Sequence, residues 1–190
     1  MKVGVIAEEK NDIEVLYELT RKLINENSFS FSHFVGHGCG KLRRKCGAWA
    51  ENLIKRGCTL LVVIHDLDKR NEFQLRATLE GHIKGLPFKH SVVLIPIEEI
   101  EAWLLSDPNA IKAVFNMRKI PRIPNQPERI SDPKKFLSNL ITRNSKSHYL
   151  NTIHNRKIAA ELVIRSLKRC PSFSRYPVFL SEALKKHNGT

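Results

Sequence analysis

Short apolar runs alternate with segments of helical periodicity in the first half of the chain. Residues 60–64 are a continuous apolar run rich in β-branched side chains, residues 2–7 and 91–97 are similar runs after Lys2 and Ser91, and residues 28–35 alternate phenylalanine with serine. Continuous runs of this kind predict strands buried on both faces, which are typical of a parallel sheet. Between the runs, apolar residues at helical spacing predict helices over 13–24, 41–56 and 71–83, the first of them capped by Asn11 and Glu14. The alternation predicts an α/β fold with a mostly parallel central sheet flanked by helices.

The second half of the chain has a different character. Residues 117–133 contain four prolines among arginines and lysines, a composition that predicts an extended loop rather than another strand. Asp132 followed by Pro133 predicts the start of a helix, and further helices are expected over 155–168 and from Pro177 to Leu184. We therefore expect an α/β domain over 1–116, with a basic loop and C-terminal helices over 117–190 packed on it.

Acidic residues follow three of the predicted strands. Glu8 follows the first strand, Asp66 and Asp68 follow the run at 60–64, and Glu98 and Glu101 follow the run at 91–97. Because carboxyl ends of parallel strands meet at one edge of a sheet, these acids are expected to converge there. Clustered carboxylates suit a hard divalent cation, Mg²⁺ or its substitute Mn²⁺. The alternative is that they cap helices or are simply solvated.

Glu98 and Glu101 are weaker metal candidates than the aspartates. In a helix over 98–107 they would lie one turn apart on one face, as supporting ligands or ligands of a second metal. The alternative is an acidic first turn favoured by the helix dipole. On the same helix, Trp103 is expected in the core.

The charge balance indicates a polyanionic partner. Lysine and arginine total 32 against 19 acidic residues, a formal net charge of +13, which favours nucleic acid, DNA or RNA, as the partner. The candidate phosphate contacts are Lys10, Lys41, Arg43, Arg44, Lys69, Arg118 and Arg122. With four cysteines, no secretory signal and no membrane-spanning run, we expect a reducing cytoplasm and no membrane partner.

Two other motifs have simpler interpretations. His33, His37, Cys39 and Cys46 suggest zinc ligands, but their spacing matches no paired zinc knuckle. The glycines from Gly36 to Gly40, followed by Lys41, suggest a phosphate-binding nest, although they lack a P-loop ending and are more simply a turn before a helix. His65, between the strand and the aspartates, is expected to be packed in the core.

Three motifs together resemble a known fold. Residues 7–12 (AEEKND), 65–68 (HDLD) and 97–107 (IEEIEAWLLSD) resemble the Toprim fold, and most closely its small stand-alone bacterial nuclease-like family, related to the Toprim domain of OLD-family nucleases. The resemblance implies that Glu8, Asp66 and Asp68 bind Mg²⁺ and are catalytic. A glycine usually follows the first acid, and Glu9 stands there instead, which leaves open whether Glu8 or Glu9 is the ligand.

The resemblance also implies a function. A Mg²⁺-dependent nuclease would cleave phosphodiester bonds in DNA or RNA, as an antiphage or stress effector beside an ATPase partner. The alternative is a non-catalytic module of the same fold that binds nucleic acid or an ATPase. A primase- or topoisomerase-like enzyme is disfavoured, since no tyrosine shares a strand end with the acids and the chain has no zinc ribbon.

Overall fold

A four-stranded parallel sheet forms the centre of the molecule. The computed structural model describes residues 1–24, 29–36 and 38–185, and within them the strand order is β2-β1-β3-β4. The strands are β1 (Lys2–Ala7), β2 (Ser30–Val35), β3 (Leu60–Ile64) and β4 (His90–Leu94). Every neighbouring pair is parallel. The predicted α/β fold with a parallel sheet is confirmed.

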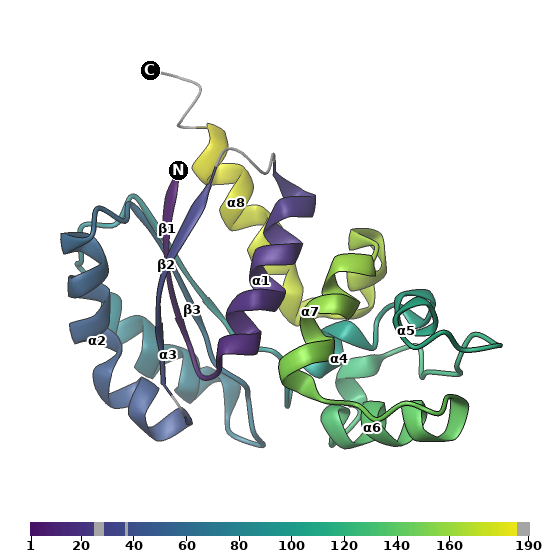
Figure 1. The fold of residues 1–190 in the computed structure, drawn as a ribbon. Coiled ribbons are helices and arrows are strands. Elements are labelled where there is room, and N and C mark those ends of the chain that lie inside the picture. Colours follow the sequence, from purple (N-terminus) through teal and green to yellow (C-terminus); the bar gives the residue numbers. More distant parts are fainter. Residues whose placement is uncertain (25–28, 37, 186–190) are drawn as a thin grey trace.

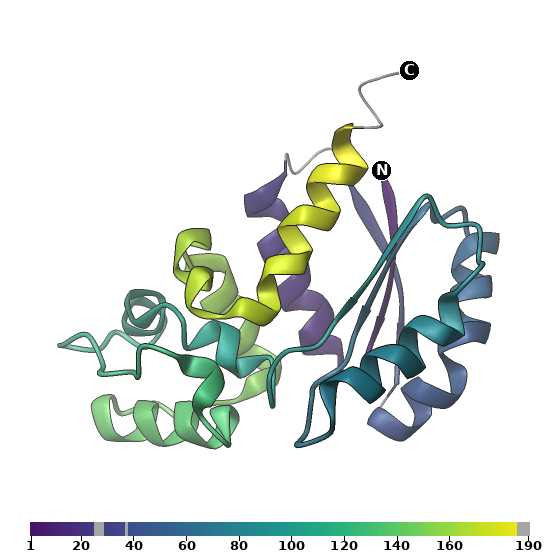
Figure 2. The same cartoon turned by 180° about the vertical axis from the view of Figure 1, so that it is seen from behind.

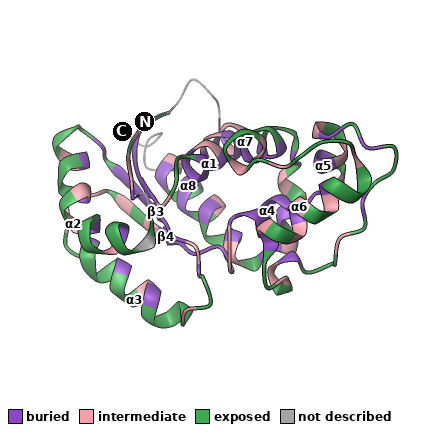
Figure 3. Ribbon diagram, turned by 60° about the horizontal axis from the view of Figure 1, so that its bottom comes forward, coloured by how far each residue is buried: buried purple, intermediate pink, exposed green. Residues whose placement is uncertain are grey.

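Helices cover both faces of the sheet (Figures 1 and 2). On one face lie α2 (Cys39–Lys55) and α3 (Glu72–Ile83), and on the other lie α1 (Lys10–Leu23) and α8 (Arg175–Lys185). Successive residues of β3 supply the two cores in turn: Leu61 and Val63 pack with α2 and α3, whereas Leu60, Val62 and Ile64 pack on the α1 side. Because side chains alternate across a strand, a run of five apolar residues is buried on both faces. Figure 3 shows the buried strands between helices whose outer faces are exposed.

The second half of the chain extends the core on the α1 side. It contains α4 (Glu101–Leu104), α5 (Pro108–Val114), α6 (Pro133–Asn144) and α7 (Asn151–Glu161), with 3-10 turns at Pro127–Arg129, Ile164–Arg169 and Pro171–Ser174. Leu137 of α6, Ile158 of α7 and Tyr176 of α8 belong to the same buried cluster as Val5 of β1. One hydrophobic core therefore joins the two halves.

Two predicted helix starts are wrong by a few residues. Helix α1 begins at Lys10, and Glu9 caps it in a reciprocal pair with Asp12, where we had expected Asn11 and Glu14. Helix α4 begins at Glu101 rather than at Glu98. Glu98 has a left-handed backbone with φ of 60°, which a continuing α-helix does not allow.

The helix predicted over 155–168 is also displaced. Helix α7 runs from Asn151 to Glu161, and the chain then turns out of the helical conformation at Leu162. The Val163 backbone N–H donates to the Asp107 carboxylate at 2.9 Å instead of continuing the helix, and the Val163 side chain is exposed. A tertiary hydrogen bond thus ends a helix that the apolar pattern would continue.

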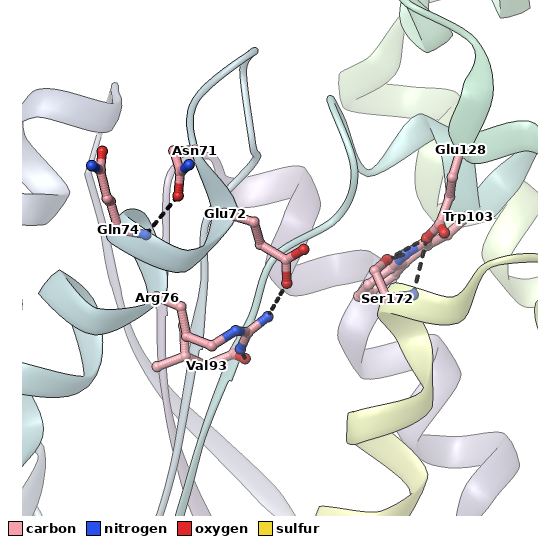
Figure 4. A network of polar contacts seen from close by, with 8 residues as sticks. All are labelled: Asn71, Glu72, Gln74, Arg76, Val93, Trp103, Glu128 and Ser172. Atoms are coloured by element: carbon pink, nitrogen blue, oxygen red, sulfur yellow. Dashed lines mark hydrogen bonds and ion pairs between the residues drawn. The ribbon is translucent and has the colours of Figure 1, made fainter.

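Polar contacts join the elements around the sheet (Figure 4). Arg76 of α3 donates to Glu72 and to the Val93 carbonyl of β4, both at 2.7 Å, which fixes α3 beside the edge strand. On the other side, the buried Trp103 indole donates to the Ser172 hydroxyl at 2.8 Å. Trp103 lies in the core as predicted, and this bond ties α4 to the turn before α8.

None of the helices within the described ranges combines the length and the apolar character that crossing a membrane requires.

Candidate functional site

Four carboxylates from separate segments lie close together at the carboxyl edge of the sheet. Glu8 follows β1, Asp66 follows β3, Asp12 lies in the first turn of α1, and Glu101 begins α4. Burial, together with the charges of Asp12, Glu101, Glu8 and Asp68, raises the pKa of Asp66 well above its ordinary value. We call Glu8, Asp12, Asp66 and Glu101 the carboxylate cluster.

Asp12 is a member that the sequence analysis missed. Its side chain is only 5% exposed, and burial and the charges of Glu101, Glu9 and Glu8 raise its pKa to about 8, against the opposing effect of the hydrogen bond from the Glu9 backbone. A signal was present in the sequence, because Asp12 lies three, four and seven residues before Val15, Leu16 and Leu19 on the buried face of α1. An acid on an apolar helical face is a candidate for a site.

Glu101 is held in the cluster by residues near α7. It is 2% exposed and accepts hydrogen bonds from the Tyr149 hydroxyl at 2.9 Å and from the Asn155 amide at 3.1 Å. Burial and the neighbouring Glu101 charge raise the pKa of Tyr149, so the hydroxyl stays protonated and able to donate. No local pattern identifies Tyr149 or Asn155, since they lie 48 and 54 residues away in the chain.

Glu8 contacts His65, which is fully buried as predicted. The His65 Nδ1 lies 2.7 Å from Glu8 Oε1 and 2.6 Å from the Asp66 carbonyl oxygen. The first contact lacks hydrogen-bond geometry, so Glu8 Oε1 is buried without a hydrogen bond from any described residue. A buried carboxylate oxygen without a hydrogen bond is energetically costly and is available to a cation or a water molecule.

Asp68 and Glu98 lie at the rim of the cluster. Asp68 is exposed and pairs with Arg70 at 3.0 Å, whereas Glu98 accepts a hydrogen bond from the Lys69 backbone at 2.9 Å. The two acids line a cleft of about 230 Å³ together with Glu99. The prediction that Glu98 and Glu101 share a helical face is wrong, because helix α4 begins only at Glu101. Glu98 lies in the turn before the helix, where its carbonyl oxygen accepts a hydrogen bond from the Asp68 backbone N–H.

Lys134 is a cation whose pKa is influenced by the acids. It lies in the first turn of α6, and its backbone N–H donates to Glu99 at 2.8 Å. Burial lowers the pKa of Lys134, but the charges of Glu101, Glu9, Glu99 and Asp66 outweigh burial and raise it, so the ammonium group remains charged. The sequence analysis did not single out this lysine, which is one of many in a basic region.

The predicted phosphate contacts are scattered. Lys10 begins α1 beside the cluster, and Lys69 lies at its rim. Lys41 and Arg44 are exposed on α2, while Arg43 is half-buried. Arg118 and Arg122 are exposed in the proline-containing loop, which lies on the far side of the C-terminal helices from the sheet (Figures 1 and 2). Among these residues, Lys69 lines the cleft with Asp68 and Glu98, whereas the exposed Lys10 side chain lies beside Glu14.

The chemistry of the donor set fits a hard divalent cation, since the set consists of carboxylate oxygens, and one of them, Glu8 Oε1, accepts no hydrogen bond from the described residues. Across the described ranges, however, no three His, Cys, Asp or Glu side chains are grouped as they would be around a metal ion. The carboxylates must therefore turn toward one another to hold one. Of the alternative zinc ligands, His37 lies outside the described residues.

A comparison with protein families identifies the chain. Residues 9–180 match the family model described as Domain of unknown function (DUF4276). The chain belongs to the DUF4276 family. The DUF4276 match extends from the cap of α1 into α8, so it includes Asp12, Asp66 and Glu101, while Glu8 immediately precedes it. No curated protein and no solved structure matched the chain.

Proposed function

We propose that this DUF4276 protein is a Mg²⁺-dependent nuclease of the Toprim type that hydrolyses phosphodiester bonds in DNA or RNA. The observation that carries the proposal is the carboxylate cluster at the carboxyl edge of a parallel sheet, where burial and the charges of four other acids raise the pKa of Asp66. Acids held together in a buried site repel one another unless a cation offsets their charge. A bound divalent cation is the simplest such partner.

The cluster residues take distinct roles in this proposal. Asp66 and Asp68 would hold Mg²⁺, with Glu101 as a supporting acid that Tyr149 and Asn155 orient. When bound, the metal supplies charge neutralisation and an acidic water. Glu8 serves either as a further ligand or as the base that takes a proton from the attacking water, through Oε1, which lies beside His65 and accepts no hydrogen bond from the described residues.

Hydrolysis adds this water to phosphorus and breaks the bond to one sugar oxygen, which takes up a proton as it leaves. Lys134, kept charged beside the acids, is placed to attract the phosphate or to stabilise that leaving oxygen. Lys69, in the cleft with Asp68 and Glu98, and Lys10, at the start of α1, would hold the flanking phosphates.

The test is cleavage of end-labelled single- and double-stranded DNA and RNA in Mg²⁺ or Mn²⁺. Asp66→Asn keeps the shape of the side chain and removes its charge. We expect this variant to lower the cleavage rate more than about 100-fold, because losing a direct metal ligand costs more than the roughly 10- to 100-fold typical of losing a residue that only supports a ligand. Glu80→Gln is the matched control, because Glu80 is an exposed carboxylate on α3. Cleavage by Asp66→Asn at the wild-type rate would refute the assignment.

A second candidate is a non-catalytic module of the same fold. It is favoured by Glu9 in place of the glycine usual in Toprim proteins, and by the lack of a metal-binding trio among the described side chains. Such a module would bind nucleic acid and cleave none of the four substrates with either metal. An ATPase partner, which the Toprim resemblance implies, is compatible with both candidates.

A further inference from the structure

A groove runs along the exposed side of α1, beginning beside the carboxylate cluster. It consists of two adjoining cavities of about 440 Å³ and 370 Å³, both lined by Lys10 and Glu14. Glu9 and Thr152 line the first cavity, and Tyr17, Phe31, His33 and Arg156 line the second. Helix α7 lies against α1 and forms the opposite wall (Figure 1). We call this feature the α1 groove.

The far end of the α1 groove is aromatic. The ring centroids of Tyr17 and Phe31 are 5.7 Å apart, and each lies 5.3 Å from the Phe29 ring. Tyr17 and Phe31 are half-buried, so part of each ring remains accessible on the groove wall. Aromatic side chains that are fixed by one another and open on one side are suited to stacking with a nucleobase, whatever its identity.

Two cations line the groove at different points. The Lys10 side chain is 78% exposed and lies 3.7 Å from Glu14, and the Arg156 side chain is 54% exposed. Arg156 Nε donates to the buried Glu18 at 2.8 Å, and its two Nη groups bond to no other described residue. Glu18 therefore fixes the arginine while its terminal nitrogens remain available to a phosphate. Two acids, Glu9 and Glu14, also line the groove. Glu14 is partly neutralised by Lys10 and can accept hydrogen bonds from base amino groups.

The direction of the groove connects it to the proposed chemistry. From Glu9 to Tyr17 is eight residues of helix, or about 12 Å. Paired bases in a duplex have no free face to stack on a protein ring, whereas unpaired bases do. An aromatic subsite flanked by phosphate contacts thus selects an unpaired strand and leads it toward the carboxylates.

We infer that the α1 groove binds single-stranded nucleic acid, with a base stacked on Tyr17 and Phe31 and phosphates at Arg156 and Lys10. The inference rests on the proposed nuclease function only in that the groove would lead the bound strand to the carboxylate cluster for cleavage. Binding of the strand in the groove requires no cleavage. It assigns a substrate class to the proposed function, namely unpaired strands rather than duplexes.

Binding is tested by fluorescence anisotropy with a labelled 12-nucleotide oligothymidylate and with its duplex, in EDTA so that nothing is cleaved. We expect the single strand to bind at least about tenfold more tightly than the duplex. Tyr17→Leu should weaken single-strand binding roughly 5- to 150-fold, the range for losing one stacked base. Arg156→Gln should weaken it by at least about fivefold through the loss of a phosphate contact. Phe73→Leu and Arg165→Gln are the controls and should have no effect: Phe73 is 81% exposed on α3, and Arg165 is exposed outside the groove.

A second readout does not depend on the stability of the variants. An oligonucleotide carrying 5-iodouracil should photocrosslink to the wild-type protein at Tyr17 or Phe31, which peptide mass spectrometry locates. Duplex binding as tight as single-strand binding, Tyr17→Leu and Arg156→Gln binding like wild type, or crosslinks confined to other elements would each overturn the inference.

The inference and the proposed function can fail separately. If oligothymidylate binding depends on Tyr17 and Arg156 but Mg²⁺ produces no cleavage of any substrate, the nuclease proposal fails and the groove assignment stands. If Asp66-dependent cleavage occurs while Tyr17→Leu and Arg156→Gln leave binding unchanged, the groove assignment fails alone.

Discussion

Replacing Glu101 by glutamine separates the charge of the carboxylate cluster from its packing. The glutamine carbonyl can still accept the hydrogen bonds from Tyr149 and Asn155, which are 2.9 Å and 3.1 Å long with Glu101, so both donors keep an acceptor. One negative charge is lost next to Asp66 and Asp12, whose pKa values are raised partly by Glu101. The metal-free variant should therefore be at least as stable as wild type, because like-charge repulsion in the cluster falls.

Metal affinity should change in the opposite direction. Loss of a supporting acid typically weakens metal binding by about 10- to 100-fold. At a Mg²⁺ concentration about 100 times the wild-type dissociation constant, binding stabilises the wild-type fold by about 2.7 kcal/mol and the variant by only about 0.4 to 1.4 kcal/mol. With about 2–4 °C of melting temperature per kcal/mol for a chain of this size, the Mg²⁺-induced shift falls from roughly 5–11 °C to about 1–6 °C.

The assay combines calorimetric Mg²⁺ titration with thermal melts of wild type, Glu101→Gln and the exposed control Glu80→Gln, each with and without metal. The control should behave as wild type in both measurements. If Glu101→Gln bound Mg²⁺ with wild-type affinity and showed the full thermal shift, Glu101 would have no part in a metal site and its burial would be structural only.

Two further predictions concern packing and charge. Trp103→Ala should leave a core cavity and lower the free energy of unfolding, measured by urea titration, by roughly 3–5 kcal/mol. Trp103→Phe should lower it by only about 0.5–1.5 kcal/mol, through the lost hydrogen bond to Ser172. A loss below about 1 kcal/mol in Trp103→Ala would contradict the packing described. Oligothymidylate affinity should fall roughly sevenfold between about 50 and 200 mM salt if only Lys10 and Arg156 contact phosphates, and more steeply if other basic residues take part. An affinity indifferent to salt would exclude a phosphate-based interface.

Local patterns predicted the sheet well, for a physical reason. The apolar run at 60–64 can be buried only between two layers, and this requirement made β3 a central strand. Residues 2–7 form β1 with the predicted limits. The helix predicted over 41–56 ends at Lys55, shortly before Gly57, whose φ is 79°. The helix that ends at Glu161 instead of continuing shows the limit of such patterns, since its end depends on the distant Asp107.

The site was predictable only in part. Strand ends identified Glu8 and Asp66, because parallel strands bring their carboxyl ends to one edge. The grouping of Glu98 with Glu101 failed because it assumed a helix where the backbone at Glu98 is left-handed. Whether the acids bind Mg²⁺ remains a prediction, as does every contact with nucleic acid.

The C-terminal half contributes to the site differently from what its charge suggested. The first part of its proline-containing loop, which carries the predicted phosphate contacts Arg118 and Arg122, extends away from the sheet (Figures 1 and 2), whereas the end of the loop, at Ser131 and Asp132, lines the cleft with Asp68 and Glu98. Instead, Lys134 near the start of α6 and Tyr149 and Asn155 around α7 supply a cation and two hydrogen bonds to acids from the first half. Arg156, one residue further along α7, forms part of the α1 groove. A chain ending at residue 116 would leave Glu101 without these hydrogen-bond partners and would remove Leu137, Ile158 and Tyr176 from the shared core, so neither the cluster nor the groove can belong to the first half alone.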